Sequence, residues 1–117
     1  MADSNVIDWE QMDMIADGYT PDFVDILREF VAEMPGLLSE LASQRTAGDL
    51  EKAGRIAHQI KGSAANFGFT ATSQAAAAIE HAAKAGSWGD FDADFEKARS
   101  GWEAALVELR DKRNVNL

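Results

Sequence analysis

Apolar residues recur along the chain at spacings of three and four, which is the period of an α-helix, and alternation with period two is nearly absent. The clearest apolar stripe predicts a long helix that ends near Gly48, with the apolar side chains Phe23, Leu27, Phe30, Met34, Leu37 and Leu41. Thr20 is its expected N-cap, and Pro21 its first residue, where a missing N–H is tolerated. Pro35 lies inside the stripe, so we expect it to kink the helix or to split it in two.

The same period predicts three further helices after the long one. Asp49 starts a helix that Gly68 ends, with the apolar stripe Leu50, Ala53, Ile56, Ala57, Ile60, Ala64 and Phe67. Thr70 is expected to cap the next helix, over 71–85, which contains an alanine tract and a single large apolar anchor, Ile79. Asp90 opens the last helix, with the stripe Phe91, Phe95, Ala98, Trp102, Ala105, Leu106 and Leu109. We expect residues 111–117 to be frayed.

A short helix is predicted before the long one. Asp8 is its expected N-cap, and the helix ends near Ala16 and buries Met12 and Ile15. The loops between the long helices are short, which favours antiparallel neighbours. The sequence therefore predicts an all-α fold over residues 1–117 as one domain: an up-and-down antiparallel four-helix bundle with a short additional N-terminal helix.

Charge and composition narrow the function. The chain has 117 residues, 20 of them acidic and 11 of them Lys or Arg, for a net charge of −9. This balance argues against nucleic-acid binding and against anionic membrane surfaces. There is no cysteine, the N-terminus is polar and acidic, and no apolar run approaches the roughly 18 residues of a membrane span. We therefore expect a cytoplasmic protein without a bound cofactor or metal.

His58 is the most informative residue for function. Turned at 100° per residue, the helix that follows Asp49 places His58 more than a right angle from the centre of its apolar stripe. The neighbours of His58 on the same face are Gly54, Gly62 and Ala65, which have little or no side chain. Each glycine inside a helix costs about 1 kcal/mol relative to alanine. A histidine left uncovered at that cost suits a nucleophile that another protein must reach.

The residues beside His58 point to phosphate chemistry. Lys61 lies one turn further on, between the ring and the apolar stripe, where its cation can stabilise a phosphoryl group on the imidazole. Ser63 and Asn66 lie on the other flank, where they can donate hydrogen bonds to a docked partner or to water.

A tight turn at Gly68 would place the next helix antiparallel to the helix of His58. Glu80 then lies level with His58, and Lys84 lies level with Gly54. We expect Glu80 on the flank of its helix, not buried, where it can accept a hydrogen bond from the Nδ1–H of His58. That contact would leave Nε2 as the free nucleophile.

These residues together resemble the histidine-containing phosphotransfer (HPt) domains of bacterial phosphorelays. The resemblance covers nearly the whole chain and is carried by His58-x-x-Lys61-Gly62-Ser63-Ala64, by Asp49 to Ala53, by Gly68, by Met34 to Leu38 and by Ile79-Glu80. It implies an all-α bundle that accepts a phosphoryl group from a receiver-domain aspartate or a hybrid histidine kinase and passes it to a response-regulator receiver.

The resemblance also implies roles for individual residues. His58 would be the phosphoacceptor and Lys61 the assisting cation, and Gly62 would leave room for the receiver. Some family members have glutamine at the position of Glu80, where it would contact the phosphoryl group, whereas glutamate suits the orientation of the ring. The residues expected to contact the partner are Gly54, Gly62, Ser63, Ala65 and Lys84.

Two other functions compete with that of a phosphocarrier. One is a helical-bundle adaptor that binds a signalling partner without phosphotransfer, although such a protein has no need of Lys61 and Gly62 beside His58. The other is a dimerising kinase fragment, which the four long helices of a single chain argue against; we expect a monomer. The chain has no Gly-rich nucleotide loop, so we expect no ATP site and no enzyme activity of its own.

Overall fold

The structure, a computed structural model, describes residues 5–117; the polar start of the chain, residues 1–4, lies outside this range. Within it there are no strands, and the helices are α1 (Trp9–Ala16), α2 (Pro21–Ala47), α3 (Leu50–Asn66), α4 (Thr70–Lys84) and α5 (Phe91–Arg113). The predicted all-α bundle with a short N-terminal helix is confirmed.

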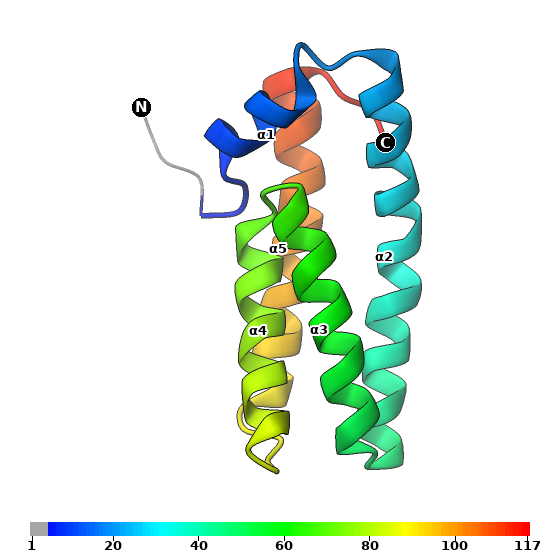
Figure 1. Ribbon diagram of the computed structural model, residues 1–117, viewed down its shortest axis with the longest axis vertical. Helices are drawn as coiled ribbons and strands as arrows, with labels where there is room; N and C mark the ends of the chain where they lie inside the picture. The colour runs from blue at the N-terminus through cyan, green and yellow to red at the C-terminus, as the bar shows by residue number, and fades with distance from the viewer. Residues whose placement is uncertain (1–4) are drawn as a thin grey trace.

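The four longer helices lie along the long axis of the molecule (Figure 1). Followed by colour, the chain runs down α2, up α3, down α4 and up α5, and α1 lies across the upper end. Helix α3 packs against both α2 and α4, and α4 packs against α5. The α3–α4 pair therefore presents one helix-helix junction on the outside of the bundle, and this junction carries His58 and Glu80.

The predicted N-caps at Asp8 and Thr20 are formed, and Asp49, the predicted start of α3, is a third. Side-chain oxygens of Asp8, Thr20 and Asp49 accept hydrogen bonds from the backbone N–H three residues later, at 3.1, 3.3 and 3.0 Å. Each cap satisfies one of the unpaired N–H groups at the start of a helix. These polar residues therefore fix where α1, α2 and α3 begin.

The predicted cap at Thr70 is wrong. Helix α4 begins at Thr70 itself, its N-cap residue is Phe69, and no side chain caps it. The Thr70 hydroxyl instead donates to the backbone carbonyl of Asn5 at 3.5 Å, and the N–H of Ala71 reaches the carbonyl of Val6. Phe69 is fully buried, so burial of its ring determines the conformation here, and the N-terminal segment supplies the hydrogen-bond acceptors.

Pro35 does not split the long helix. A single helix, α2, extends from Pro21 to Ala47 and includes Pro35. A proline inside a helix removes one backbone hydrogen bond and costs about 3 kcal/mol or more. The buried neighbours Met34 and Leu38 anchor both sides of the proline in the core, and this packing offsets the loss. Leu38 lies outside the predicted stripe and is an addition to the core.

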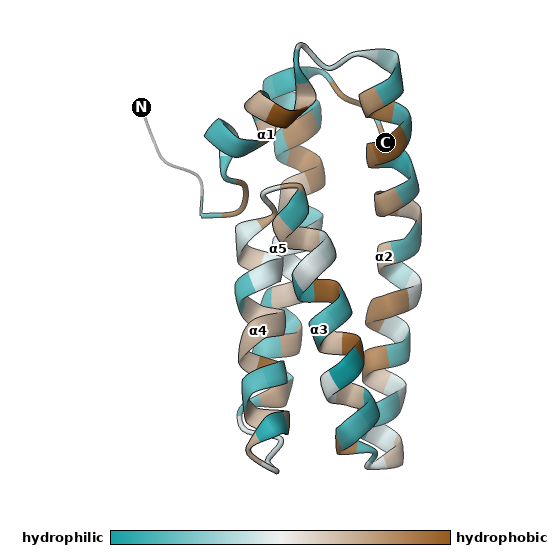
Figure 2. Cartoon of the chain, viewed as in Figure 1, coloured by the Kyte–Doolittle hydropathy of each residue, from teal (hydrophilic) through white to brown (hydrophobic). Residues whose placement is uncertain are grey.

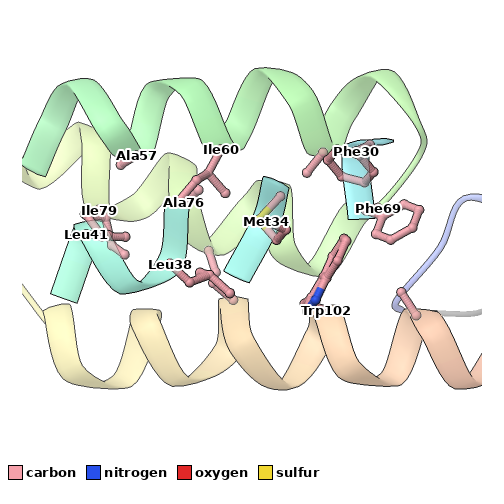
Figure 3. Close-up of a cluster of buried hydrophobic side chains, with 14 of the residues drawn as sticks. Phe30, Met34, Leu38, Leu41, Ala57, Ile60, Phe69, Ala76, Ile79 and Trp102 are labelled. Atoms are coloured by element: carbon pink, nitrogen blue, oxygen red, sulfur yellow. The ribbon is translucent and has the colours of Figure 1, made fainter. Parts of the chain in front are cut away.

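An aromatic cluster fills the core near the end of α3 (Figure 3). The ring of Phe30 stacks on Phe67, with centroids 4.7 Å apart. The same ring meets the rings of Phe69 and Trp102 edge to face, at 5.1 and 5.2 Å. Because these residues come from α2, the α3–α4 turn and α5, the cluster joins three parts of the bundle.

Two expectations near the chain ends are wrong. Ile15 is 41% exposed, because α1 contacts the bundle through Met12 and Ala16, which are both buried. Residues 111–117 are not frayed throughout: α5 continues to Arg113, and Val115 is buried, with its N–H donating to the carbonyl of Leu109 at 3.1 Å.

An ion pair between α1 and α5 explains why the C-terminal end of α5 is not frayed. The Nε and Nη2 atoms of Arg113 donate to the two carboxylate oxygens of Asp13, at 2.8 and 2.5 Å. The guanidinium of Arg113 and the hydroxyl of Tyr19 lower the pKa of Asp13, whose desolvation acts in the opposite direction. Helix α1 is thus fastened to the last turn of α5.

Candidate functional site

His58 lies near the middle of α3 with its side chain 65% exposed. A Cβ atom at Gly62, one turn later, would meet nothing within 4 Å. The half of α3 nearer its start is mostly hydrophilic on its outer face (Figure 2). The imidazole therefore lies on an open, polar stretch of the helix, and Gly62 has no side chain that could cover it.

Gly54 faces the neighbouring helix. A Cβ atom there would lie 3.0 Å from the Cβ of Ala83, so the glycine allows α3 and α4 to approach closely at this point. A groove follows this junction and is lined by Gly54, Arg55, Ala83 and Lys84 as well as by His58. Arg55 was not singled out from the sequence, although its position three residues before His58 is a usable signal.

Glu80 is the residue on which the site converges. Its Oε2 atom lies 2.6 Å from Nδ1 of His58 and 3.2 Å from Nζ of Lys84, and its Oε1 atom lies 2.6 Å from Nζ of Lys61. The side chain is only 6% exposed, so the expectation that Glu80 is not buried is wrong. Two ammonium groups and the imidazole replace the water that a buried carboxylate loses.

The three partners keep Glu80 ionised. The hydrogen bond from Lys61 lowers its pKa most; desolvation acts against this, and Lys84 and His58 lower the pKa further, to about 2. An ionised carboxylate only accepts hydrogen bonds. The proton of a neutral His58 ring must therefore sit on Nδ1, and the lone pair on Nε2, at the opposite side of the ring.

Of the other predicted site residues, Lys61 and Lys84 join this centre through Glu80, and the rest lie around it. The backbone carbonyl of Lys61 also accepts a hydrogen bond from the hydroxyl of Ser73 at 3.1 Å. Ser63 is partly buried, and Ala65 is exposed. The carbonyl of Ala65 accepts a hydrogen bond from the side chain of Gln11 at 2.8 Å, which brings α1 beside the C-terminal half of α3. The docking roles expected of Gly54, Gly62, Ser63, Ala65 and Lys84 stay predictions.

Within residues 5–117, no group of three or more His, Asp or Glu side chains is arranged to hold a metal ion. In the same range, no helix combines the length and the apolar character that crossing a membrane requires.

Comparison with known protein families gives one match. A protein family described as the Hpt domain matches residues 25–112. This range includes most of α2, nearly all of α5 and the whole site between α3 and α4. The match covers well over half of the chain, and the chain belongs to the Hpt domain family. Comparisons with curated proteins and with solved structures find no match.

The low pKa of Glu80 makes a testable contribution to stability. Its value falls from 4.5 to about 2 on folding, so the stabilisation is complete above about pH 5 and is lost as the pH falls towards 2. Because His58 and Lys84 are exposed, we expect a contribution on the order of 1–2 kcal/mol. Urea unfolding of the wild type and Glu80→Gln should show this difference at pH 6 and a much smaller one at pH 3. A difference independent of pH would contradict the assignment.

Proposed function

We propose that this chain is a phosphocarrier in which Nε2 of His58 accepts a phosphoryl group from a receiver-domain aspartyl phosphate or a hybrid histidine kinase and passes it to a response-regulator receiver. Membership of the Hpt family places the chain in phosphotransfer of two-component signalling. The observation that carries the proposal is the 2.6 Å contact between Nδ1 of His58 and the ionised carboxylate of Glu80. This contact directs the lone pair to the exposed side of the ring.

The proposed transfer needs little from this chain beyond the nucleophile and its surroundings. The Nε2 lone pair attacks phosphorus while the bond from phosphorus to the aspartyl oxygen breaks, and the partner's carboxylate leaves. The partner supplies the acidic pocket and its Mg²⁺, which offset the charge of the transferred group. Lys61 bonds to the same carboxylate as the ring and can turn its ammonium from Glu80 towards the phosphoryl oxygens.

The proposed docking face is the exposed side of α3 around His58. Gly62 faces open space on it, and the groove beside His58 carries the cations Arg55 and Lys84. Residues 50–87 contain four Lys or Arg and only two Glu, of which Glu80 is buried, in a chain of net charge −9. This charge distribution suits the acidic pocket of a receiver.

We further propose that residues 1–117 form one HPt domain, an up-and-down four-helix bundle that acts as a monomer in the cytoplasm. One chain supplies all four long helices, so the bundle needs no second copy. A sizing column or analytical ultracentrifugation of the purified protein tests the monomer directly.

The decisive experiment is phosphoryl transfer. The protein is incubated with phosphorylated receiver domains and sampled at short times, and the label on this chain is tested for acid and base stability. A phosphohistidine is labile in acid and more stable in base, so we expect an acid-labile label on His58. Binding of a receiver without any label would instead support the adaptor function.

Gly62 tests the docking face. Replacing it with glutamine should raise the free energy of unfolding by several tenths of a kcal/mol, because glutamine has the higher helix propensity and the site has room for it. The same side chain should obstruct the receiver beside His58, and we expect transfer to fall at least tenfold. Stopped-flow transfer assays and thermal melts measure the two effects. Wild-type transfer in Gly62→Gln would show that the partner docks elsewhere.

A further inference from the structure

We propose that Glu80 holds the Nδ1 proton of phosphorylated His58 and thereby sets how readily the phosphoryl group leaves. The inference rests on the proposed function of His58 as the phosphoacceptor. It assigns to Glu80 an effect of charge, in addition to orientation of the ring. The structural basis is the carboxylate itself: it is almost fully buried at the α3–α4 junction, and its Oε2 atom lies 2.6 Å from Nδ1.

The protonation of Nδ1 matters because the ring is the leaving group. When phosphorus bonds to Nε2, the ring becomes a phosphoimidazolium cation that still carries its proton on Nδ1. When the phosphoryl group passes to water or to a carboxylate, the Nε2–P bond breaks and its electron pair returns to Nε2. A ring that has kept the Nδ1 proton departs as neutral imidazole, whereas a ring that has lost it departs as the far more basic imidazolate. Retention of the proton therefore speeds transfer.

The charges that face the ring come from the two helices that form the groove. Helix α3 supplies Glu51, Arg55 and Lys61, and α4 supplies Glu80 and Lys84. Glu51 and Arg55 bond to each other at 2.7 Å. Lys61 and Lys84 both bond to Glu80. Glu80 is therefore the carboxylate that directly contacts the ring, and the same carboxylate bonds to Lys61 and Lys84.

The expected size of the effect follows from the contact. A carboxylate in hydrogen-bond contact favours the ring that keeps its Nδ1 proton over the ring that has lost it, and the exposure of the His58 side chain weakens this preference. Loss of the Glu80 charge should therefore slow cleavage of the Nε2–P bond about tenfold at pH 8. At pH 5.5 the solvent supplies protons far more readily, and the effect should nearly vanish.

The test measures the lifetime of the phosphorylated protein without any partner. Wild type, Glu80→Gln and Glu80→Ala are loaded with phosphoramidate, a small donor that releases ammonia, and hydrolysis is followed by ³¹P NMR at pH 8 and pH 5.5. The matched control is Glu51→Gln. Glu51 lines the same groove, but its carboxylate bonds to Arg55 and not to the ring. Circular dichroism establishes that each variant is folded.

We expect the half-life of phosphorylated Glu80→Gln to be about tenfold longer than that of the wild type at pH 8 and within twofold of it at pH 5.5. Glu51→Gln should match the wild type at both values. The amide oxygen of glutamine still accepts the Nδ1–H bond, so equal lifetimes of Glu80→Gln and wild type at pH 8 would mean that Glu80 only orients the ring, and the inference would be overturned. Failure of the wild type to carry phosphate on His58 would instead contradict the proposed function.

Discussion

Replacing His58 with glutamine should abolish phosphoryl transfer and leave the free energy of unfolding within about 0.5 kcal/mol of the wild type. The side chain is 65% exposed and lies outside the core, so its removal leaves no cavity. Glutamine can still donate a hydrogen bond to Glu80, which also keeps Lys61 and Lys84 as partners. Transfer from a phosphorylated receiver and urea unfolding measure the two quantities.

The chain offers a matched control in His81, its other histidine, which is also exposed. His81→Gln removes the same chemical group from α4 and should transfer at the wild-type rate. Label that persists in His58→Gln would place the phosphoacceptor elsewhere. A loss of stability above about 2 kcal/mol in His58→Gln would show that the imidazole has a structural role.

The position of the site was predictable because α3 has a clean apolar stripe. When one face of a helix is strongly apolar, the angle of every other residue follows from the 3.6-residue period. The exposed ring of His58 and the open space at Gly62 follow from that angle. The position of Glu80 opposite His58 followed from the tight turn at Gly68, because two residues at equal distances from the turn of a helical hairpin face each other.

The burial of Glu80 was not predictable from the same arguments. A carboxylate on a helix flank is normally exposed, since burial of a charge without partners is very unfavourable. Here the partners come from two helices: His58 and Lys61 from α3, and Lys84 from α4. The sequence shows that each residue is present, but only the packing of α3 on α4 shows that one carboxylate contacts all three.

The ends of the chain illustrate the same limit. The pairing of Arg113 with Asp13 joins residues 100 positions apart, and no local pattern indicates it. The sequence predicted a frayed tail over residues 111–117, whereas α5 continues to Arg113, the residue that pairs with Asp13. Propensity is a weak guide wherever such contacts decide the structure.

Phe30→Ala should lower the free energy of unfolding by about 3–5 kcal/mol, the largest stability effect that we expect from a single substitution in this chain. The ring is 6% exposed and packs against Phe67, Phe69 and Trp102, so alanine would leave a cavity where three parts of the bundle meet. A domain of this size is stable by about 5–15 kcal/mol, so the loss is a large share of the total. Urea unfolding at pH 7 measures it.

The matched control for Phe30→Ala is Ile26→Ala, which truncates an apolar side chain one turn earlier on α2. Ile26 is 52% exposed, so its loss should change the free energy of unfolding by no more than about 0.5 kcal/mol. Phe30 is at the end of the bundle where α3 stops, whereas His58 lies two turns earlier on that helix. Phe30→Ala should therefore still transfer phosphate at temperatures where it remains folded. Equal losses of stability in the two variants would mean that the aromatic cluster does not hold α2, α5 and the α3–α4 turn together.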